Sequence, residues 1–236
     1  MTAAAARAEL DRLRGGLVVS CQARDDNPLR GPAFMAAMAQ AAVLGGAVGI
    51  RADGEADVAA IRQAIGPDVP VLGIFKVKQP DGSLFITPTA EAARRVIAAG
   101  ARLVALDGTT RPRPGGETLA YVVAAIHAAA GAALADVGTA EDARYAVSCG
   151  VDAVGTTLSG YTPDSPKTEG PDFPLLERLA RECPVPVFAE GRIWTREEAR
   201  RALDLGAAFV VVGTAITNPT AITARIVSAM TGNGGG

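Results

Sequence analysis

Four stretches of the chain share one layout: LGGAVGIR (44–51), AGARLVALD (99–107), CGVDAVGTT (149–157) and LGAAFVVVGT (205–214). In each, a segment with helical patterning ends in glycine, and a short apolar run follows at once. Glycine readily adopts the left-handed conformation that closes a helix. A run of Val, Ile, Leu and Ala without alternation is typical of a strand buried on both faces of a parallel sheet. The layout therefore predicts consecutive parallel β/α units.

Further apolar runs alternate with helical patterns along the rest of the chain. Strands are predicted at 16–21, 47–51, 69–75, 102–107, 132–136, 152–156, 185–190 and 208–214, and helices at 32–44, 55–65, 89–99, 117–130, 139–149, 172–182, 195–205 and 219–230, with Thr89, Thr139 and Thr195 as helix caps. Eight such units in 236 residues favour a closed barrel over an open doubly wound sheet, and no GxGxxG motif follows the first strand. We predict an α/β fold, a single (β/α)8 TIM barrel over residues 1–230. An extra N-terminal helix is predicted at 3–13 and a disordered tail at 231–236.

Composition excludes several classes of protein. With 49% apolar residues the chain can bury a large core, and its net charge of −2 provides no basic surface for nucleic acid. The three cysteines form no CxxC or Cys/His cluster, so we predict no metal site, no disulfide framework and a cytoplasmic location. No signal peptide and no apolar stretch of about 18 residues is present, so no membrane association is predicted.

The residues that end the predicted strands are almost all polar. In a (β/α)8 barrel the active site lies at the carboxyl ends of the strands, where these side chains would converge on one mouth. They are Cys21 and Gln22, Arg51, Lys76, Asp107, Asp136, Thr156 and Thr157, Glu190, and Gly213 with Thr214. A single polar residue at the end of a buried strand is ordinary, but eight consecutive strand ends of this kind indicate a functional site.

Lys76 is the most informative of these residues. The chain has three lysines among its 23 basic residues, so arginine serves at the other twenty positions. Arginine stays protonated, whereas a lysine in a desolvated pocket can lose its proton and act as a base. Two alternatives remain: Lys76 forms a structural ion pair, or Lys78 is the functional group. Glu190 could move a proton or orient another group.

The last two strand-to-helix loops suggest an anion site. Gly213 and Thr214 resemble the backbone cradle for phosphate that barrels build there, and Gly191 with Arg192 would form the other wall. Glycine at such a turn is also common for steric reasons alone. His127, the only histidine, lies within a helical pattern, and we place it on the outer ring rather than in a catalytic triad.

Nine motifs at these positions resemble those of the bacterial N-acetylmannosamine-6-phosphate 2-epimerases, which are (β/α)8 barrels of sialic-acid catabolism. The motifs are SCQA (20–23), NPLRGP (27–32), GIRA (49–52), GIFK (73–76), ALDGTTRPRP (105–114), AD (135–136), GTTLSGYT (155–162), AEGRI (189–193) and VVGTAITNP (211–219). They follow one another over nearly the whole chain.

The resemblance implies a role for each matching residue. Lys76 would be the catalytic proton-transfer residue and Glu190 its carboxylate partner. Gln22, Arg51 and Asp136 would bind a small phosphosugar, and the last loop would hold its phosphate. The resemblance also implies a homodimer formed through the C-terminal helix region. The chain departs from the family at Asn218, where an arginine is common, so either phosphate affinity is lower or Arg192 compensates.

The expected reaction interconverts N-acetylmannosamine 6-phosphate and N-acetylglucosamine 6-phosphate. The sugar ring must open to make C1 an aldehyde, because only then is the C2 proton acidic enough to remove. This chemistry needs no metal and no nicotinamide cofactor. The second proton donor could be a protein group or a substrate hydroxyl. Two alternatives are another phosphosugar-acting TIM-barrel enzyme and a non-catalytic sugar-phosphate sensor.

Overall fold

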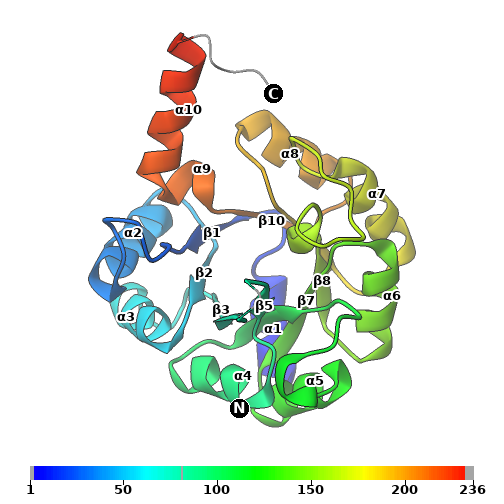
Figure 1. Ribbon diagram of the computed structural model, residues 1–236. Helices are drawn as coiled ribbons and strands as arrows, with labels where there is room; N and C mark the ends of the chain where they lie inside the picture. Colours follow the sequence, from blue (N-terminus) through cyan, green and yellow to red (C-terminus); the bar gives the residue numbers. More distant parts are fainter. Residues whose placement is uncertain (1–2, 81, 232–236) are drawn as a thin grey trace.

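A computed structural model describes residues 3–80 and 82–231 and shows a closed parallel barrel (Figure 1). Its strands are β1 (Leu17–Cys21), β2 (Gly49–Asp53), β3 (Val71–Ile74), β6 (Leu103–Asp107), β7 (Ala132–Asp136), β8 (Ala153–Gly155), β9 (Val187–Glu190) and β10 (Phe209–Val212). Around the barrel they follow the order β1-β10-β9-β8-β7-β6-β3-β2, and β2 pairs again with β1. The predicted (β/α)8 TIM barrel is confirmed.

Helices surround the barrel, as the glycine-terminated pattern predicts. They are α2 (Pro32–Leu44), α3 (Glu55–Ile65), α4 (Ala90–Ala98), α5 (Leu119–Ala128), α6 (Ala140–Ser148), α7 (Phe173–Glu182), α8 (Arg196–Asp204) and α10 (Pro219–Thr231), with the short helices η1 (Pro114–Gly116), η2 (Thr156–Leu158) and α9 (Thr214–Thr217) in loops. The three predicted threonine caps are confirmed, since each hydroxyl accepts a hydrogen bond from the backbone three residues later.

The N-terminal helix α1 (Ala3–Asp11) closes the end of the barrel opposite the carboxyl ends of the strands. Leu10 and Leu13 are buried in one cluster with barrel-interior side chains, among them Phe188 and Phe209, whose rings stack at 5.0 Å. This apolar floor leaves the other end of the barrel for polar residues. The predicted tail lies outside the described residues, except for Thr231, which ends α10.

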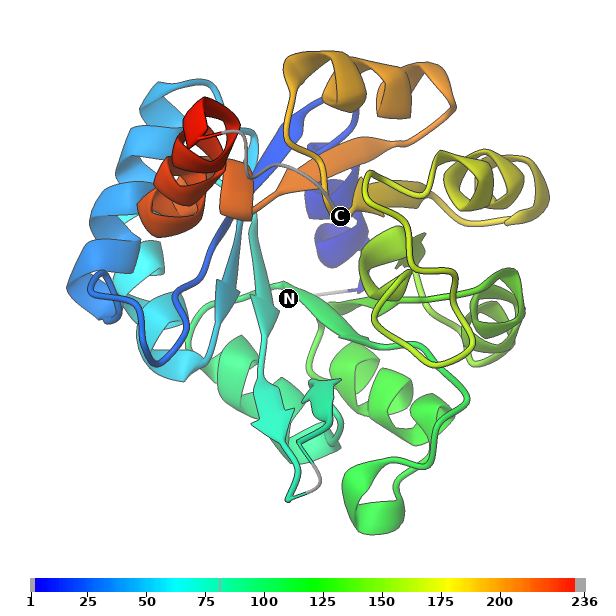
Figure 2. The same cartoon turned by 45° about the horizontal axis from the view of Figure 1, so that its top comes forward.

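Four strand ends differ from the prediction: β8 ends one residue early at Gly155, β10 ends two residues early at Val212, and the ends of β2 and β3 also move. β2 continues to Asp53 instead of ending at Arg51, so Arg51 lies within the barrel with 1% of its side chain exposed. β3 ends at Ile74, and Lys76 instead begins a hairpin of β4 (Lys76–Lys78) and β5 (Leu84–Ile86) that projects from the ring (Figure 2). At the base of the hairpin the Thr87 hydroxyl accepts from the Phe75 N–H and donates to the Ala105 carbonyl, which ties the returning chain to the end of β3 and to β6.

Candidate active site

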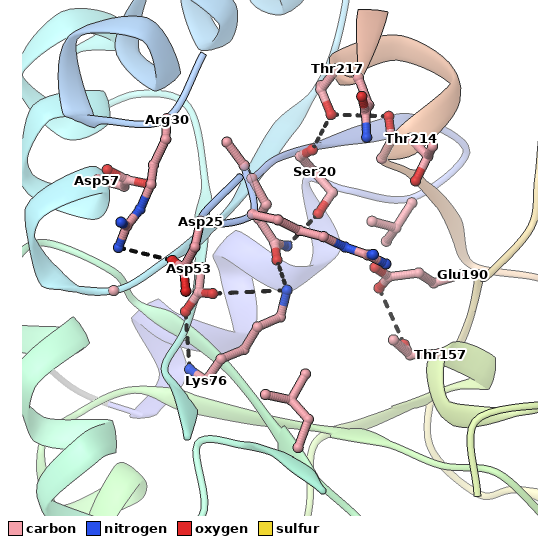
Figure 3. A pocket seen from close by; sticks show the side chains of 18 of the residues that line it. Ser20, Asp25, Arg30, Asp53, Asp57, Lys76, Thr157, Glu190, Thr214 and Thr217 are labelled. Atoms are coloured by element: carbon pink, nitrogen blue, oxygen red, sulfur yellow. Dashed lines mark hydrogen bonds and ion pairs between the residues drawn. The ribbon is translucent and has the colours of Figure 1, made fainter. Parts of the chain in front are cut away.

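The carboxyl ends of the strands surround an open pocket of about 1560 Å³. Two groups of polar side chains form its opposite walls, one around Lys76 and one around Glu190 (Figure 3). β3, which leads to Lys76, and β9, which ends at Glu190, are separated by three strands in either direction around the barrel. A small molecule bound between them would therefore have an amine on one side and a carboxyl on the other.

A buried ion pair lies beneath the Glu190 wall. The Arg51 guanidinium donates to both carboxylate oxygens of Asp136, at 3.0 and 2.7 Å, and to Glu190 Oε2 at 2.6 Å. The Thr157 hydroxyl lies 2.5 Å from Asp136 Oδ1 and 3.2 Å from Glu190 Oε2. Burial alone would lower the pKa of Arg51, but the charges of Asp136 and Glu190 outweigh burial and raise it. Arg51 is therefore a permanent cation that fixes both carboxyls.

Glu190 is the carboxyl in this group that can exchange a proton near neutral pH. Burial raises its pKa to about 7; Arg51 opposes the rise and Asp136 adds to it. Glu190 reaches the pocket, with 13% of its side chain exposed, whereas Asp136 is fully buried. A carboxyl with this pKa can serve either as an acid or as a base.

Lys76 is held by groups from two other strands. Its Nζ donates to Gln22 Oε1, and Gln22 is oriented in turn because its Nε2 donates to Ser20 Oγ at 2.5 Å. Asp53 Oδ2 lies 3.8 Å from the same Nζ. Desolvation lowers the pKa of the Lys76 amine, and Asp53 opposes that effect. The environments of Lys76 and Glu190 thus bring the two pKa values closer together.

The hairpin that carries Lys76 is anchored by Arg111. Its guanidinium packs over the Phe85 ring, with Cζ 4.2 Å from the centroid, and donates to the Leu84 carbonyl at 3.3 Å. The same side chain pairs with Asp107, which is 1% exposed. Asp107 therefore serves the site indirectly, by tying the hairpin to the end of β6.

The two loops predicted to form an anion site, which follow β9 and β10, also reach the pocket. Gly191, Arg192, Gly213 and Thr214 line it, as does Asn218. Gly191 has a φ of 115°, a conformation that favours glycine. Arg192 donates to the Ser159 and Gly170 carbonyls and to Thr168 Oγ1, at 2.6, 2.8 and 2.9 Å, so much of its hydrogen-bonding capacity holds the preceding loop. Asn218 accepts from the Ala221 N–H at 3.1 Å and thereby caps α10.

The chain is similar in sequence and in structure to proteins of one known family. The family model described as "Putative N-acetylmannosamine-6-phosphate epimerase" matches residues 35–232. The chain belongs to this epimerase family. A solved structure, the N-acetylmannosamine-6-phosphate 2-epimerase from Clostridium perfringens, superposes with a TM-score of 0.90 at 44% identity, covering 93% of this chain and 95% of that one.

Relatives of known sequence agree with the family assignment. Two proteins named "Putative N-acetylmannosamine-6-phosphate 2-epimerase" cover most of the chain. The one from Caldanaerobacter subterraneus subsp. tengcongensis is 48% identical over 93% of this chain and 92% of its own length. The one from Cutibacterium acnes is 50% identical over 89% of this chain and 92% of its own length. The chain thus spans nearly the full length of these family members.

The structure brings most of the sequence-predicted residues of this family member to one pocket: Gln22, Lys76, Glu190, Gly191, Arg192, Gly213 and Thr214. Arg51 and Asp136 are nearly inaccessible instead, so direct substrate binding by these two remains a prediction. His127 lies on α5 and contacts Asp152 at 2.8 Å. The sequence did not indicate that Asp53 contacts Lys76 or that Arg111 anchors the hairpin. The one signal for Asp53 is that it lies two residues beyond the predicted end of a strand.

Side chains of the usual metal-ligating types do not cluster in the described part of the chain. Within 3–80 and 82–231, no three side chains of His, Cys, Asp or Glu gather closely enough to hold a metal ion. The same part of the chain contains no helix long and apolar enough to cross a membrane.

Proposed function

We propose that the enzyme interconverts N-acetylmannosamine 6-phosphate and N-acetylglucosamine 6-phosphate by removing and returning the proton at C2 of the open-chain sugar. The observation that carries this proposal is the placement of Lys76 and Glu190 on opposite walls of one pocket. Inversion of a carbon needs proton removal on one face and delivery on the other. The family assignment supplies the substrate.

The two groups would act in turn on C2. One takes the proton, and the electron pair left on carbon delocalises onto the C1 oxygen of the aldehyde to form an enolate. The other group then delivers its proton to the opposite face of C2, and the C1 carbonyl re-forms. Reversal exchanges the roles of the two groups. Glu190 thus fills the place of the second donor.

This scheme predicts the pH dependence of activity. The active pair holds a single transferable proton, on either Lys76 or Glu190. Below the pKa of Glu190, which is about 7, both groups are protonated and no base is present. Above the pKa of Lys76, which burial lowers, both have lost their protons and no acid is present. For both directions of the interconversion, we expect a bell-shaped dependence of kcat/KM on pH, with the acidic limb near pH 7. A flat profile between about pH 6 and 10 would contradict a single proton shared by Lys76 and Glu190.

The phosphate of the substrate would lie between the loops after β9 and β10. Gly191, Arg192, Gly213 and Thr214 line that side of the pocket. Asn218 supplies no charge there and caps α10 instead. Backbone groups and Arg192 would therefore carry phosphate recognition, although the loop oxygens that Arg192 binds compete for its N–H groups.

A direct assay separates this function from its alternatives. Each epimer, phosphorylated and unphosphorylated, is incubated with the enzyme and followed by proton NMR. Approach to the same equilibrium mixture from either phosphorylated epimer is the expected result. A sugar-phosphate sensor would bind these compounds without converting them, and a different phosphosugar enzyme would leave both unchanged. Equal rates with and without phosphate would overturn the proposed phosphate site.

We also infer that the enzyme is a homodimer joined through α10. This helix extends away from the barrel (Figure 1) and has no buried residue. It exposes Ile226, Val227 and Met230 at 57%, 50% and 80%, a cluster that would be covered in a dimer.

The three cysteines are free, which agrees with action in a reducing cytoplasm.

Charge placed on α10 should dissociate this dimer. The double substitution Ile226→Asp and Val227→Asp is expected to produce a monomer in analytical ultracentrifugation, because it would bury two unpaired carboxylates in the interface. Tyr121→Asp is the matched control, since Tyr121 is 55% exposed on the distant helix α5. A wild-type monomer, or a double variant that stays dimeric, would overturn the inference.

A further inference from the structure

Asp53 contacts Lys76 in two ways. It ends β2, and its Oδ1 accepts the backbone N–H of Lys76 at 3.0 Å, at the first residue of the hairpin. Its Oδ2 lies 3.8 Å from Lys76 Nζ. One carboxylate therefore holds both ends of the lysine, the backbone by a hydrogen bond and the amine by charge. Figure 3 shows Asp53 beside Lys76, on the wall opposite Glu190.

We propose that Asp53 is a positioning residue, which orients Lys76 in the pocket and whose negative charge sets the pH at which the amine gives up its proton. This inference rests on the proton-transfer role proposed for Lys76. Asp53 acts through the lysine and need not touch the reacting carbon.

The charges that face Lys76 come from several elements. Asp53 and Arg51 lie on β2, Glu190 on β9, and Arg24 in the loop after β1. Arg51 and Arg24 favour the neutral amine, as does burial, whereas Asp53 and Glu190 favour the charged one. Among these charges, Asp53 has the largest effect on Lys76. Glu190 is itself neutral for part of the working pH range, so the charge that it presents to the amine changes with pH.

Without this carboxylate, burial and the two arginines would lower the pKa of Lys76 further. The amine would then be neutral over more of the pH range. At a given pH, less of the lysine would carry the proton that must be returned to C2. Asp53 thus keeps the lysine able to act in both directions of a reversible reaction. A purely structural Asp53 would do no more than hold the hairpin through the backbone N–H.

The variant Asp53→Asn separates the two roles. The asparagine oxygen can still accept the Lys76 N–H, but its charge is gone. Only three lysines are present, so enzyme labelled with 13C-lysine gives three side-chain signals, which Lys78→Arg and Lys167→Arg assign. The Lys76 signal is titrated in the substrate-free enzyme. We expect Asp53→Asn to lower the Lys76 pKa by about one unit, as loss of an opposite charge at this distance does.

Two control variants sharpen the test. Asp53→Glu keeps the charge and should leave the Lys76 pKa within a few tenths of a unit of wild type. Glu55→Gln removes a carboxylate two residues away that pairs with Arg95, and should leave the Lys76 pKa unchanged. If Asp53→Asn does not fold, Asp53→Ser serves in its place. An unshifted Lys76 pKa in the neutral variant, or an equal shift in Glu55→Gln, would overturn the proposal.

Kinetics supply a second readout. The basic limb of the kcat/KM profile should move about one pH unit lower in Asp53→Asn, because that limb reports the loss of the Lys76 proton. A reduced rate with an unmoved limb would assign Asp53 a structural role only and would overturn the proposal. If the wild-type enzyme does not exchange the C2 proton but the Lys76 pKa still shifts in the variant, the proposed function fails while the electrostatic role of Asp53 stands.

Discussion

Lys76→Ala is expected to lower kcat for interconversion by about 10³-fold or more in both directions. Without the amine, one face of C2 has no group to take or return a proton. The side chain is about one-third exposed and fills no core position, so the free energy of unfolding should change by less than about 0.5 kcal/mol. Coupled turnover assays and a thermal melt check the two statements separately.

Lys78→Ala is the matched control for this variant. Lys78 lies on the same short strand β4, two residues further along the chain. Lys78 also lines the pocket, but the proposed proton transfer uses Lys76 and Glu190, so the loss of Lys78 should leave kcat within about threefold of wild type. Near wild-type turnover in Lys76→Ala, or loss of activity in Lys78→Ala alone, would transfer the proton-transfer role to Lys78 and contradict our assignment.

Glu190→Gln should abolish interconversion, with a loss of about 10²- to 10⁴-fold, yet preserve part of the chemistry. Glutamine fills the same space and can still accept from Arg51, but it cannot move a proton. Lys76 can then remove the C2 proton from one epimer and return a solvent proton to the same face. In heavy water that epimer should gain deuterium at C2 without inversion, as NMR would detect.

Lys76→Ala and Glu190→Gln together test whether each residue transfers the proton on one face of C2. Lys76→Ala should lose the exchange that Glu190→Gln keeps, because that exchange depends on the lysine. Inversion at a near wild-type rate in Glu190→Gln would show that a substrate hydroxyl, or another group, delivers the second proton. Exchange in both epimers in that variant would contradict the placement of one group on each face.

The barrel could be predicted from the sequence because its signals are local. A glycine followed by an apolar run marks many of the helix-to-strand junctions, as at Gly100 before β6, and threonine hydroxyls mark several helix starts. The ends of β2 and β3 could not be read in this way. Arg51 is charged but stays in the barrel because Asp136 neutralises it from a strand 85 residues away in sequence. The Lys76 hairpin is short and polar, with no periodicity to reveal it.

The candidate site was predictable to the same degree. Residue type and strand end identified Lys76 and Glu190, since both lie beside the carboxyl end of a buried strand. The contacts that adjust them are non-local: Gln22 and Asp53 hold the lysine, and Thr157 holds the glutamate. Such pairings depend on which strands lie opposite or adjacent once the barrel closes, and no spacing within one segment reveals them.

The fate of the C2 hydrogen tests the central claim most directly. Wild-type enzyme is incubated in heavy water with N-acetylmannosamine 6-phosphate, and the product is examined by proton NMR and mass spectrometry during the first turnovers. Proton transfer through Lys76 and Glu190 predicts that N-acetylglucosamine 6-phosphate forms with deuterium at C2 and at no other carbon. Product that retains the original C2 hydrogen, or a bound sugar that neither inverts nor exchanges, would contradict it.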